Sequence, residues 1–259
     1  MPERDIHLSV VIPAYKEGER IGRNLLEVDK YLKAKDFPYE ILVVVDGSPD
    51  NTAEVCRNYS HQVANLRVID NAENHGKGYA VRQGLLEAKG ALRLFLDADG
   101  STSITHWDAF APEFENGADV VIGSRDLPDS FIQVHQPKYR EFMGNAGNWL
   151  IRVVLGLWRY PDTQCGFKAL TAEAAEAVAG RMVVDRFGFD FEFLVLAKKL
   201  GFKIEQLPVR WLNEEGSTVS LTGKNGFIRV LTDLFLTRWR LWTGAYRLDG
   251  RGKNETDSR

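Results

Sequence analysis

The sequence predicts an α/β fold in which a mostly parallel β-sheet is covered by helices on both faces. Short apolar runs alternate with amphipathic segments through the first half of the 259-residue chain. The runs are apolar at successive positions, which is typical of strands that are buried on both sides. The connections are short, so each strand–helix–strand unit is expected to form a right-handed crossover between parallel strands.

Each element of this half is predicted from its own local pattern. Strands are expected where apolar and β-branched residues run together, at residues 7–13, 40–46, 66–70, 92–99 and 118–124. Helices are expected at residues 18–33, 51–59 and 76–90. In the first helix, Ile21, Leu25, Leu26 and Val28 recur at helical spacing, and Asp50 is placed to cap the second helix.

The second half of the chain is less regular, but no internal repeat, low-complexity tract or linker divides it from the first. One large domain is therefore predicted over residues 1–225. A helical segment at 226–247 and a polar tail at 248–259 are expected to follow it.

Composition excludes several classes of protein. The 33 basic and 36 acidic residues give a formal net charge of −3, which argues against a dedicated nucleic-acid binder. Cys56 and Cys165 are far apart and form no disulfide or zinc-ligand pattern, so a reducing compartment is expected. A membrane-spanning helix needs about 18 uninterrupted apolar residues, and no stretch of the sequence approaches that length. If the protein meets a membrane, we expect it to lie on the surface.

Polar residues follow several of the predicted strands. In open parallel sheets, ligands bind beyond the carboxyl ends of the strands. This rule places four short segments around one crevice, namely Pro13–Glu17, Asp46–Ser48, Asp97–Asp99 and Ser124–Arg125.

Asp97 and Asp99 offer two carboxylates one residue apart at the end of an apolar run. On a strand, side chains at i and i+2 point the same way, so both would face one spot. Two carboxylates together with water and phosphate oxygens suit Mg²⁺ or Mn²⁺, which prefer oxygen ligands. The alternative is a strand-ending turn in which both aspartates are merely solvated.

Two further segments could contact a nucleotide. Asp46 ends a strand before a Gly-Ser turn and could hydrogen-bond a base or ribose, or could simply belong to a strand–turn–helix connection. Lys77 lies at a helix start, where backbone N–H groups favour anions, although a glycine-rich helix start without ligand is the alternative. Neither a Walker loop nor a dinucleotide-binding glycine fingerprint is present.

Cations and buried acids of the second half leave similar alternatives open. Arg125 ends a strand and Arg140 lies near a helix start, and arginine can clamp a phosphate through two hydrogen bonds or form a surface ion pair. Asp190 and Glu192 lie among apolar residues, where they could anchor a helix or approach the crevice. Cys165 is expected to be a small buried residue rather than a nucleophile.

Taken in order, several motifs resemble those of family 2 glycosyltransferases of the dolichyl-phosphate or polyprenyl-phosphate glucosyl- and mannosyltransferase type, with the glucosyl branch the closer match. The motifs are "VVIPAYKEGERI", "VVVDGSPDNT", "NHGKGYAVRQGLLEAKG", "LFLDADGST", "VVIGSRD", "DTQCGFKALT", "FDFEFLVLAKKLG" and "VRWLNEEGS". They cover about residues 8–218, and their order makes the resemblance specific although each motif alone is weak. The chain departs from the family at Val45, where an aspartate is usual, and at Thr218, where a lysine is common.

The resemblance implies a GT-A fold that uses a nucleotide-sugar donor and a divalent metal, Mg²⁺ or Mn²⁺. Matched by motif, Pro13, Ala14, Tyr15 and Glu17 would line the nucleotide pocket, with Asp46 near the base. The metal and diphosphate motif would be Asp97, Ala98 and Asp99, and the lipid phosphate would be held by Arg125 and Arg140. The implied reaction is inverting transfer of glucose from UDP-glucose to a polyprenyl phosphate on the cytoplasmic membrane face.

Three alternatives remain open. The donor could be GDP-mannose, or the acceptor could be a soluble or saccharide hydroxyl, or the protein could bind a nucleotide without catalysis. A phosphate monoester is already an anionic nucleophile, whereas a hydroxyl acceptor needs a carboxylate to take its proton. Asp162, Asp190 and Glu192 would then be the candidate bases.

The segment from residue 224 to 247 is basic, apolar at helical spacing and rich in tryptophan. Its apolar positions are Phe227, Val230, Leu231, Leu234, Phe235, Trp239, Trp242 and Tyr246. Five residues are basic (Lys224, Arg229, Arg238, Arg240 and Arg247), and Asp233 is the one acid. An amphipathic helix of this kind suits a membrane interface. The alternative is a helix that packs on the sheet with its basic residues in water.

Overall fold

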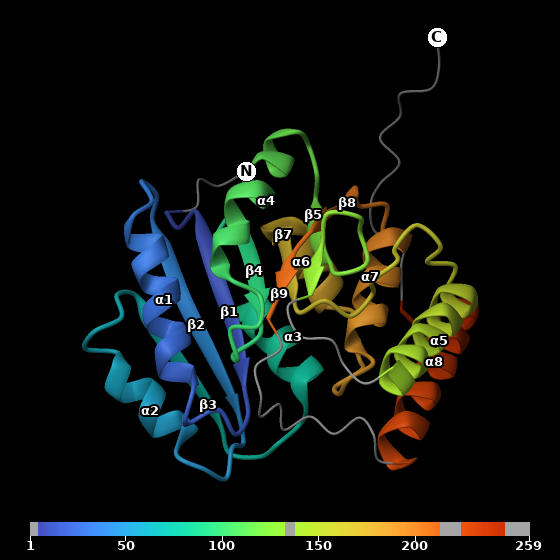
Figure 1. Cartoon of the computed structure of the whole chain (residues 1–259), viewed down its shortest axis with the longest axis horizontal. Coiled ribbons are helices and arrows are strands. Elements are labelled where there is room, and N and C mark those ends of the chain that lie inside the picture. The colour runs from blue at the N-terminus through green and yellow to red at the C-terminus, as the bar shows by residue number, and fades with distance from the viewer. Residues whose placement is uncertain (1–4, 133–137, 213–223, 247–259) are drawn as a thin grey trace.

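The computed structural model describes residues 5–132, 138–212 and 224–246. At its centre lies a seven-stranded sheet with the order β3-β2-β1-β4-β7-β5-β8 (Figure 1). Its strands are β1 (Leu8–Ala14), β2 (Tyr39–Asp46), β3 (Leu66–Asn71), β4 (Leu92–Leu96), β5 (Val120–Ser124), β7 (Phe167–Thr171) and β8 (Ile204–Pro208). A second sheet pairs β6 (Phe131–Ile132) with β9 (Arg210–Trp211). The helices are α1 (Ile21–Lys33), α2 (Thr52–Tyr59), α3 (Lys77–Glu87), α4 (Trp107–Glu115), α5 (Lys138–Leu155), α6 (Ala172–Ala179), α7 (Phe189–Lys199) and α8 (Lys224–Thr243), with a short 3₁₀ turn, η1, at Ile104–His106.

All neighbouring strands of the large sheet are parallel except at β7, which runs antiparallel to β4 and β5. The chain enters β7 beside the carboxyl ends of its two neighbours, where Gly166 lies against Asp97 and Cys165 against Gly123. A strand that starts at the carboxyl edge must run back across the sheet, so β7 is reversed. The prediction of a mostly parallel sheet covered by helices is confirmed.

Alternate residues of the strands bury opposite faces of the sheet. Val10 and Ile12 of β1 pack in a cluster with residues of α1, α2 and α4, whereas Val11 packs in a cluster with residues of α3, α6 and α7. This alternation follows from the two-residue period of a β-strand. It explains why β1 and β2 are apolar throughout, since all their side chains are buried.

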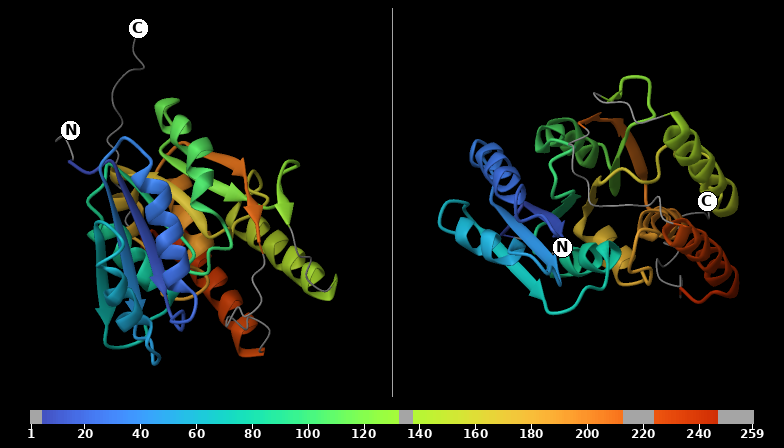
Figure 2. Two further views of the ribbon diagram at one scale, coloured as in Figure 1. Left: turned by 60° about the vertical axis from the view of Figure 1, so that its left-hand side comes forward. Right: turned by 60° about the horizontal axis from the view of Figure 1, so that its bottom comes forward.

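Helices α5 and α8 lie side by side at one end of the molecule, as the views of Figures 1 and 2 agree. Helix α8 also contacts α7, and Leu234 in its middle is buried in the core. The predicted segment 226–247 corresponds largely to α8, whereas the predicted tail at 248–259 lies outside the described residues. Among the helices described, none is long and apolar enough to cross a bilayer.

Candidate functional site

Asp97 and Asp99 lie in the turn that follows β4, and not on the strand itself. β4 ends at Leu96, and the backbone N–H of Gly100 donates to Asp97 O at 3.3 Å. Gly100 has a φ of +71°, a conformation that glycine adopts without a steric penalty. The expectation that the two carboxylates share one face of a strand is therefore wrong. The turn instead places both at the carboxyl edge, and Asp99 Oδ1 accepts a hydrogen bond from the backbone N–H of Ser101 at 2.9 Å.

Two neighbouring segments hold this turn in place. The side-chain amide of Asn24 in α1 donates to the carbonyl oxygens of Asp97 (3.3 Å) and Ala98 (3.1 Å). Gly166 lies against the carboxylate, because an added Cβ there would come within 2.1 Å of Asp97 Oδ2. The Asp97 carboxylate therefore rests directly on the turn that leads into β7.

Lys77 forms an ion pair with the Asp97 carboxylate. Its Nζ lies 2.6 Å from Asp97 Oδ1 at the N-terminal end of α3. Burial lowers the pKa of Lys77, but the carboxylates of Asp97, Asp190 and Asp99 outweigh this effect and hold the pKa above its ordinary value. The ammonium is therefore charged and sits where a diphosphate bound to this turn would meet it.

Glu17 adds a third carboxylate to the neighbourhood. Burial raises its pKa, and the nearby charges of Asp99 and Asp97 raise it further, although Arg20 acts in the opposite direction. The Arg20 guanidinium pairs with Glu17, and its Nη2 donates a hydrogen bond to Glu17 Oε1 at 2.8 Å. The Glu17 carboxylate is therefore close enough to Asp97 and Asp99 to sense their charges.

The loops after β1, β2 and β3 are tied to one another by hydrogen bonds. The backbone N–H of Lys16 donates to Ser48 Oγ (2.8 Å), and that of Glu17 donates to Thr52 Oγ1 (2.9 Å). The Asp46 carboxylate is buried and accepts from the Asn74 side chain (2.8 Å) and from the backbone of His75 (3.0 Å) and Gly76 (2.6 Å). Asp46 thus orders the loop that leads to Lys77, and its predicted contact with a nucleotide base stays a prediction.

The other residues predicted to line the nucleotide pocket differ in their exposure. Pro13 and Ala14 are buried within β1, where they pair in register with β2. The Tyr15 side chain, by contrast, is 39% exposed directly beyond the strand. An aromatic ring at this position offers a surface on which a base could stack.

Arg125 lies at the end of β5 in a close ion pair with Asp162. Its Nε donates to Asp162 Oδ2 at 2.7 Å and its Nη2 to Oδ1 at 3.0 Å. Burial lowers the pKa of Arg125, but the Asp162 carboxylate more than compensates, so Arg125 stays protonated. Burial raises the pKa of Asp162, but the Arg125 guanidinium more than compensates and holds that pKa below its usual range. The guanidinium also lies over the ring of Trp211, at 5.7 Å from its centroid. Arg140 lies in the first turn of α5, and its side chain is outside the described residues.

The structure joins Arg125 to the carboxylate turn through β9. Trp211 forms a bridge with Thr102, and the N–H of Leu212 donates to Ser101 O at 2.8 Å. The segments predicted to surround one crevice are thus connected by contacts along the carboxyl edge of the sheet.

Sequence patterns alone missed several residues that build this edge. Asn24 could have been found, because it is a polar residue on the apolar face that Ile21, Leu25 and Val28 define on α1. Lys168 carried a similar signal as a charge within an apolar strand. Gly166 and Trp211 lie in quoted motifs, but nothing in those motifs showed what the two residues contact, because the contacts join segments distant in sequence.

Each of the three candidate general bases is already engaged. Asp162 pairs with Arg125, and Asp190 pairs with the buried Lys168. Glu192 accepts hydrogen bonds from the backbone of Val184 (2.9 Å) and from the Tyr246 hydroxyl (2.6 Å). Burial raises the pKa of Glu192 and that of Asp190, and their partners counteract this only in part. These contacts favour structural roles for all three carboxylates.

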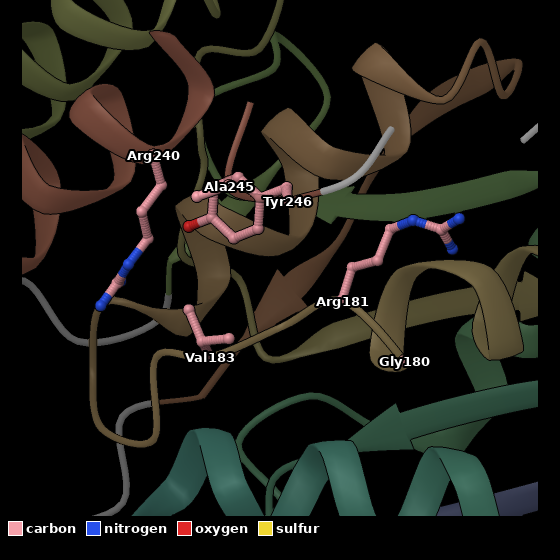
Figure 3. Close-up of a pocket in the computed structure, with 6 residues that line it drawn as sticks. All are labelled: Gly180, Arg181, Val183, Arg240, Ala245 and Tyr246. Carbon is pink, nitrogen blue, oxygen red and sulfur yellow. The ribbon is translucent and has the colours of Figure 1, made fainter. Parts of the chain in front are cut away.

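A separate hollow of about 540 Å³ lies between the end of α6 and the last turn of α8 (Figure 3). It is lined by Gly180, Arg181, Val183, Arg240, Ala245 and Tyr246. Figure 3 shows the side chains of Arg181 and Arg240 pointing away from each other, so they do not converge on one ligand. None of the residues predicted to form the site lines this hollow.

The donor set fits a metal that is shared with a substrate. Among the described residues, no group of three or more His, Cys, Asp or Glu side chains could hold a metal ion. Mg²⁺ is commonly bound by one or two carboxylates together with substrate phosphates and water. The adjacent carboxylates of Asp97 and Asp99, with Lys77 beside them, suit that mode of binding.

Comparison with known proteins assigns a family to the chain. The model of the family described as glycosyl transferase family 2 matches residues 9–178. The dolichyl-phosphate beta-glucosyltransferase ALG5A of Trichomonas vaginalis is 36% identical over 256 residues, which cover 95% of this chain and 77% of that protein. A dolichyl-phosphate beta-glucosyltransferase of Drosophila melanogaster is 34% identical over 264 residues, covering 96% of this chain and 80% of that protein.

A similar fold is found in a solved structure of glucosyl-3-phosphoglycerate synthase from Mycobacterium tuberculosis in complex with Mn²⁺, uridine-diphosphate-glucose and phosphoglyceric acid. It superposes with a TM-score of 0.66 at 18% identity, covering 90% of this chain and 80% of that one. The predicted GT-A-type fold is confirmed by this likeness and by the observed sheet. The chain belongs to glycosyl transferase family 2.

Proposed function

We propose that this protein transfers glucose from UDP-glucose to a polyprenyl phosphate of the dolichyl type, with a divalent metal, Mg²⁺ or Mn²⁺. The main observation in support is that the turn with Asp97 and Asp99 lies beside Lys77 at the carboxyl edge of the sheet. Two similar proteins are dolichyl-phosphate beta-glucosyltransferases, which supports glucose as the transferred sugar and dolichyl phosphate as the acceptor class. Their β-linked product is what inversion at an α-linked donor carbon would give.

Asp97 and Asp99 would hold the metal, and the bound ion would stabilise negative charge that develops on the departing diphosphate. Lys77 contributes from the protein itself, because its ammonium at the start of α3 can contact a phosphate oxygen. Since Asn24 and Gly166 both hold the turn, little rearrangement is needed when the donor binds. Such preorganisation makes electrostatic stabilisation effective.

The acceptor phosphate is proposed to bind near Arg125 and Arg140. Asp162 occupies the Nε and Nη2 edge of the Arg125 guanidinium and fixes its plane, so a phosphate would be held through Nη1. An anionic phosphate needs no strong base, which agrees with the engagement of Asp162, Asp190 and Glu192 in internal contacts. A hydroxyl acceptor is less well supported for the same reason.

Helix α8 supports peripheral binding to a membrane surface, which we propose to be the cytoplasmic face. Val230, Leu234 and Leu241 pack toward the core, whereas another stripe of the helix is exposed. That stripe comprises Ile228, Phe235, Trp239 and Trp242, which are 58%, 55%, 55% and 80% exposed. Arg229 and Arg238 are exposed on the same helix, and on the adjacent α5 Trp149 is 59% exposed. Exposed tryptophans with flanking arginines are typical of helices that lie in a lipid interface.

A substrate panel tests this function directly. The purified protein would be incubated with UDP-glucose, UDP-galactose and GDP-mannose, each with and without a short polyprenyl phosphate and MnCl₂, and products would be separated by mass. We expect glucosyl lipid only with UDP-glucose, and no product after EDTA treatment until Mn²⁺ or Mg²⁺ is restored. Mannosyl lipid instead would assign the donor to GDP-mannose, and transfer to a free sugar would assign a hydroxyl acceptor. Nucleotide binding without turnover under every condition would indicate a non-catalytic protein.

A further inference from the structure

An ion pair is buried inside the protein directly behind the carboxylate turn. Lys168 in β7 is 0% exposed, and its ammonium pairs with the carboxylate of Asp190, which is 7% exposed. Asp190 stands in the first turn of α7, where the helix dipole favours a negative charge. The reaction proposed above uses neither Lys168 nor Asp190.

Two aromatic rings lie near the Lys168 ammonium. Its Nζ lies 5.2 Å from the ring centroid of Phe95 and 6.0 Å from that of Phe193. A charge at such a place is costly unless it is paired and hydrogen-bonded. Replacing a buried ion pair by apolar residues of similar size is often neutral or stabilising, so the presence of this pair is weak evidence for a role in stability.

Lys168 is connected to Asp97 through backbone contacts. The Lys168 ammonium donates to the carbonyl oxygen of Cys165 at 2.6 Å. The next residue, Gly166, is the one whose added Cβ would lie 2.1 Å from Asp97 Oδ2. Lys168 therefore holds the backbone surface against which the Asp97 carboxylate rests.

Asp190 is connected to Asp97 through the charge of Lys77. Lys77 pairs with Asp97 Oδ1 at 2.6 Å, and the carboxylate of Asp190 also attracts the Lys77 ammonium. Positive and negative charges thus alternate from Lys168 through Asp190 and Lys77 to Asp97. Without the charge of Asp190, Lys77 would lose an attraction in the core and Lys168 would be left unpaired.

We propose that Lys168 and Asp190 are positioning residues that set the Asp97 carboxylate for the metal and the diphosphate, through Lys77 on one side and the Cys165–Gly166 backbone on the other. The inference rests on the function proposed above and deepens it. Neither residue touches the substrates, because both side chains are buried behind the turn.

Three variants test the proposal: Asp190→Asn, Lys168→Met, and the double variant Lys168→Met/Asp190→Leu. The double variant removes both charges together, so it avoids an unpaired buried ion and is expected to melt near the wild-type temperature. Mn²⁺ affinity in the presence of UDP would be measured from the electron paramagnetic resonance signal of free Mn²⁺, beside thermal unfolding and kcat/KM. We expect the Kd for Mn²⁺ to rise by about tenfold or more in Asp190→Asn and in the double variant, since perturbing the partners of a metal ligand typically costs 10–100-fold.

Arg93→Met is the matched control. Arg93 lies in the adjacent β4, is 1% exposed and pairs with Glu176 on α6. Its loss should lower the melting temperature while leaving the Kd for Mn²⁺ unchanged. If Lys168→Met fails to fold, Asp190→Asn and the double variant still decide the question.

The outcomes separate this inference from the proposed function. A folded Asp190→Asn or double variant whose Kd for Mn²⁺ stays within twofold of wild type would overturn the positioning role. A wild-type protein that binds no Mn²⁺ with UDP would instead overturn the metal-dependent function, and the positioning role with it. If Arg93→Met lost Mn²⁺ affinity to the same extent, general destabilisation would explain the loss in the other variants, and the proposal would be overturned.

Discussion

The two halves of the large sheet are built in different ways. The four strands of β3-β2-β1-β4 are parallel to one another, and the loops at their carboxyl edge are joined by hydrogen bonds. In β7-β5-β8 one strand is reversed, and a small accessory sheet and the helices α5 and α8 are attached.

This difference separates two tasks within one site. The regular half holds the residues proposed for the donor, which are fixed by contacts between neighbouring loops. The irregular half holds Arg125 and the exposed aromatic residues of α5 and α8, which are proposed to meet a lipid acceptor. Reversal of β7 joins the two halves, because it brings Gly166 and Lys168 to the back of Asp97.

The largest effect is expected from Asp99→Ala, which removes a proposed metal ligand from the regular half. Charge stabilisation of this kind is worth about 10²–10³-fold or more in rate, so glucosyl transfer should fall at least that far. Transfer would be followed by product mass, and folding by circular dichroism. Asp36→Ala, at an exposed acid away from the carboxyl edge, should keep full activity. An active Asp99→Ala protein would remove the metal from the proposed mechanism.

Gly166→Ala tests the junction between the halves. The new methyl group would collide with the Asp97 carboxylate, so Mn²⁺ affinity should fall by about 10–100-fold, as for other changes behind a metal ligand. Gly147→Ala is the matched control, because nothing lies within 4 Å of its added Cβ inside α5. That change should stabilise the protein by up to about 1 kcal/mol. Equal Mn²⁺ affinities in both variants would show that the Gly166 contact does not constrain Asp97.

Arg140→Ala tests the acceptor side alone. Loss of a charge-assisted hydrogen bond costs about 1.5–3 kcal/mol, so kcat/KM for polyprenyl phosphate should fall by roughly 10–100-fold. Hydrolysis of UDP-glucose without acceptor should change little. Arg159→Ala, at an exposed arginine on the same half, provides the control. Equal losses with donor and acceptor would contradict the phosphate clamp.

The smallest effect is expected from Trp239→Ala/Trp242→Ala on the exposed stripe of α8. Each indole would lose only part of its buried area in the interface, so binding to anionic vesicles should fall about tenfold. Flotation with vesicles of phosphatidylcholine and phosphatidylserine would measure it. Leu86→Ala, which removes an exposed apolar side chain from α3, should float like wild type. Undiminished flotation of the double variant would place the lipid contact elsewhere.

Much of the regular half could be predicted from sequence because its interactions are local or periodic. Buried strands are apolar at every position, and α1 shows its inner face in Ile21, Leu25 and Val28. The rule that ligands bind at carboxyl ends then singled out Asp97 and Asp99, and the position of Lys77 at a helix start singled out that residue. The end of β4 was predicted three residues too late, since nothing in "LDAD" shows that Gly100 permits a turn there.

The irregular half could not be predicted in this way. The antiparallel course of β7 depends on where the preceding loop meets the sheet, and the Arg125–Asp162 pair joins residues distant along the chain. The position of Arg125 left a phosphate clamp and an ion pair open, and the family resemblance implied the phosphate role. The structure shows a carboxylate on one edge of its guanidinium.

The amino-acid sequence by itself determined the α/β class, the five strands of the first half and the motifs of a family 2 glycosyltransferase, because apolar periodicity and short motifs depend on neighbouring residues. Only the tertiary structure decided which charges meet, namely Lys77 with Asp97, Arg125 with Asp162 and Lys168 with Asp190. The physical reason is that a buried charge requires a partner, and that partner can come from any part of the chain that folding brings within a few ångströms.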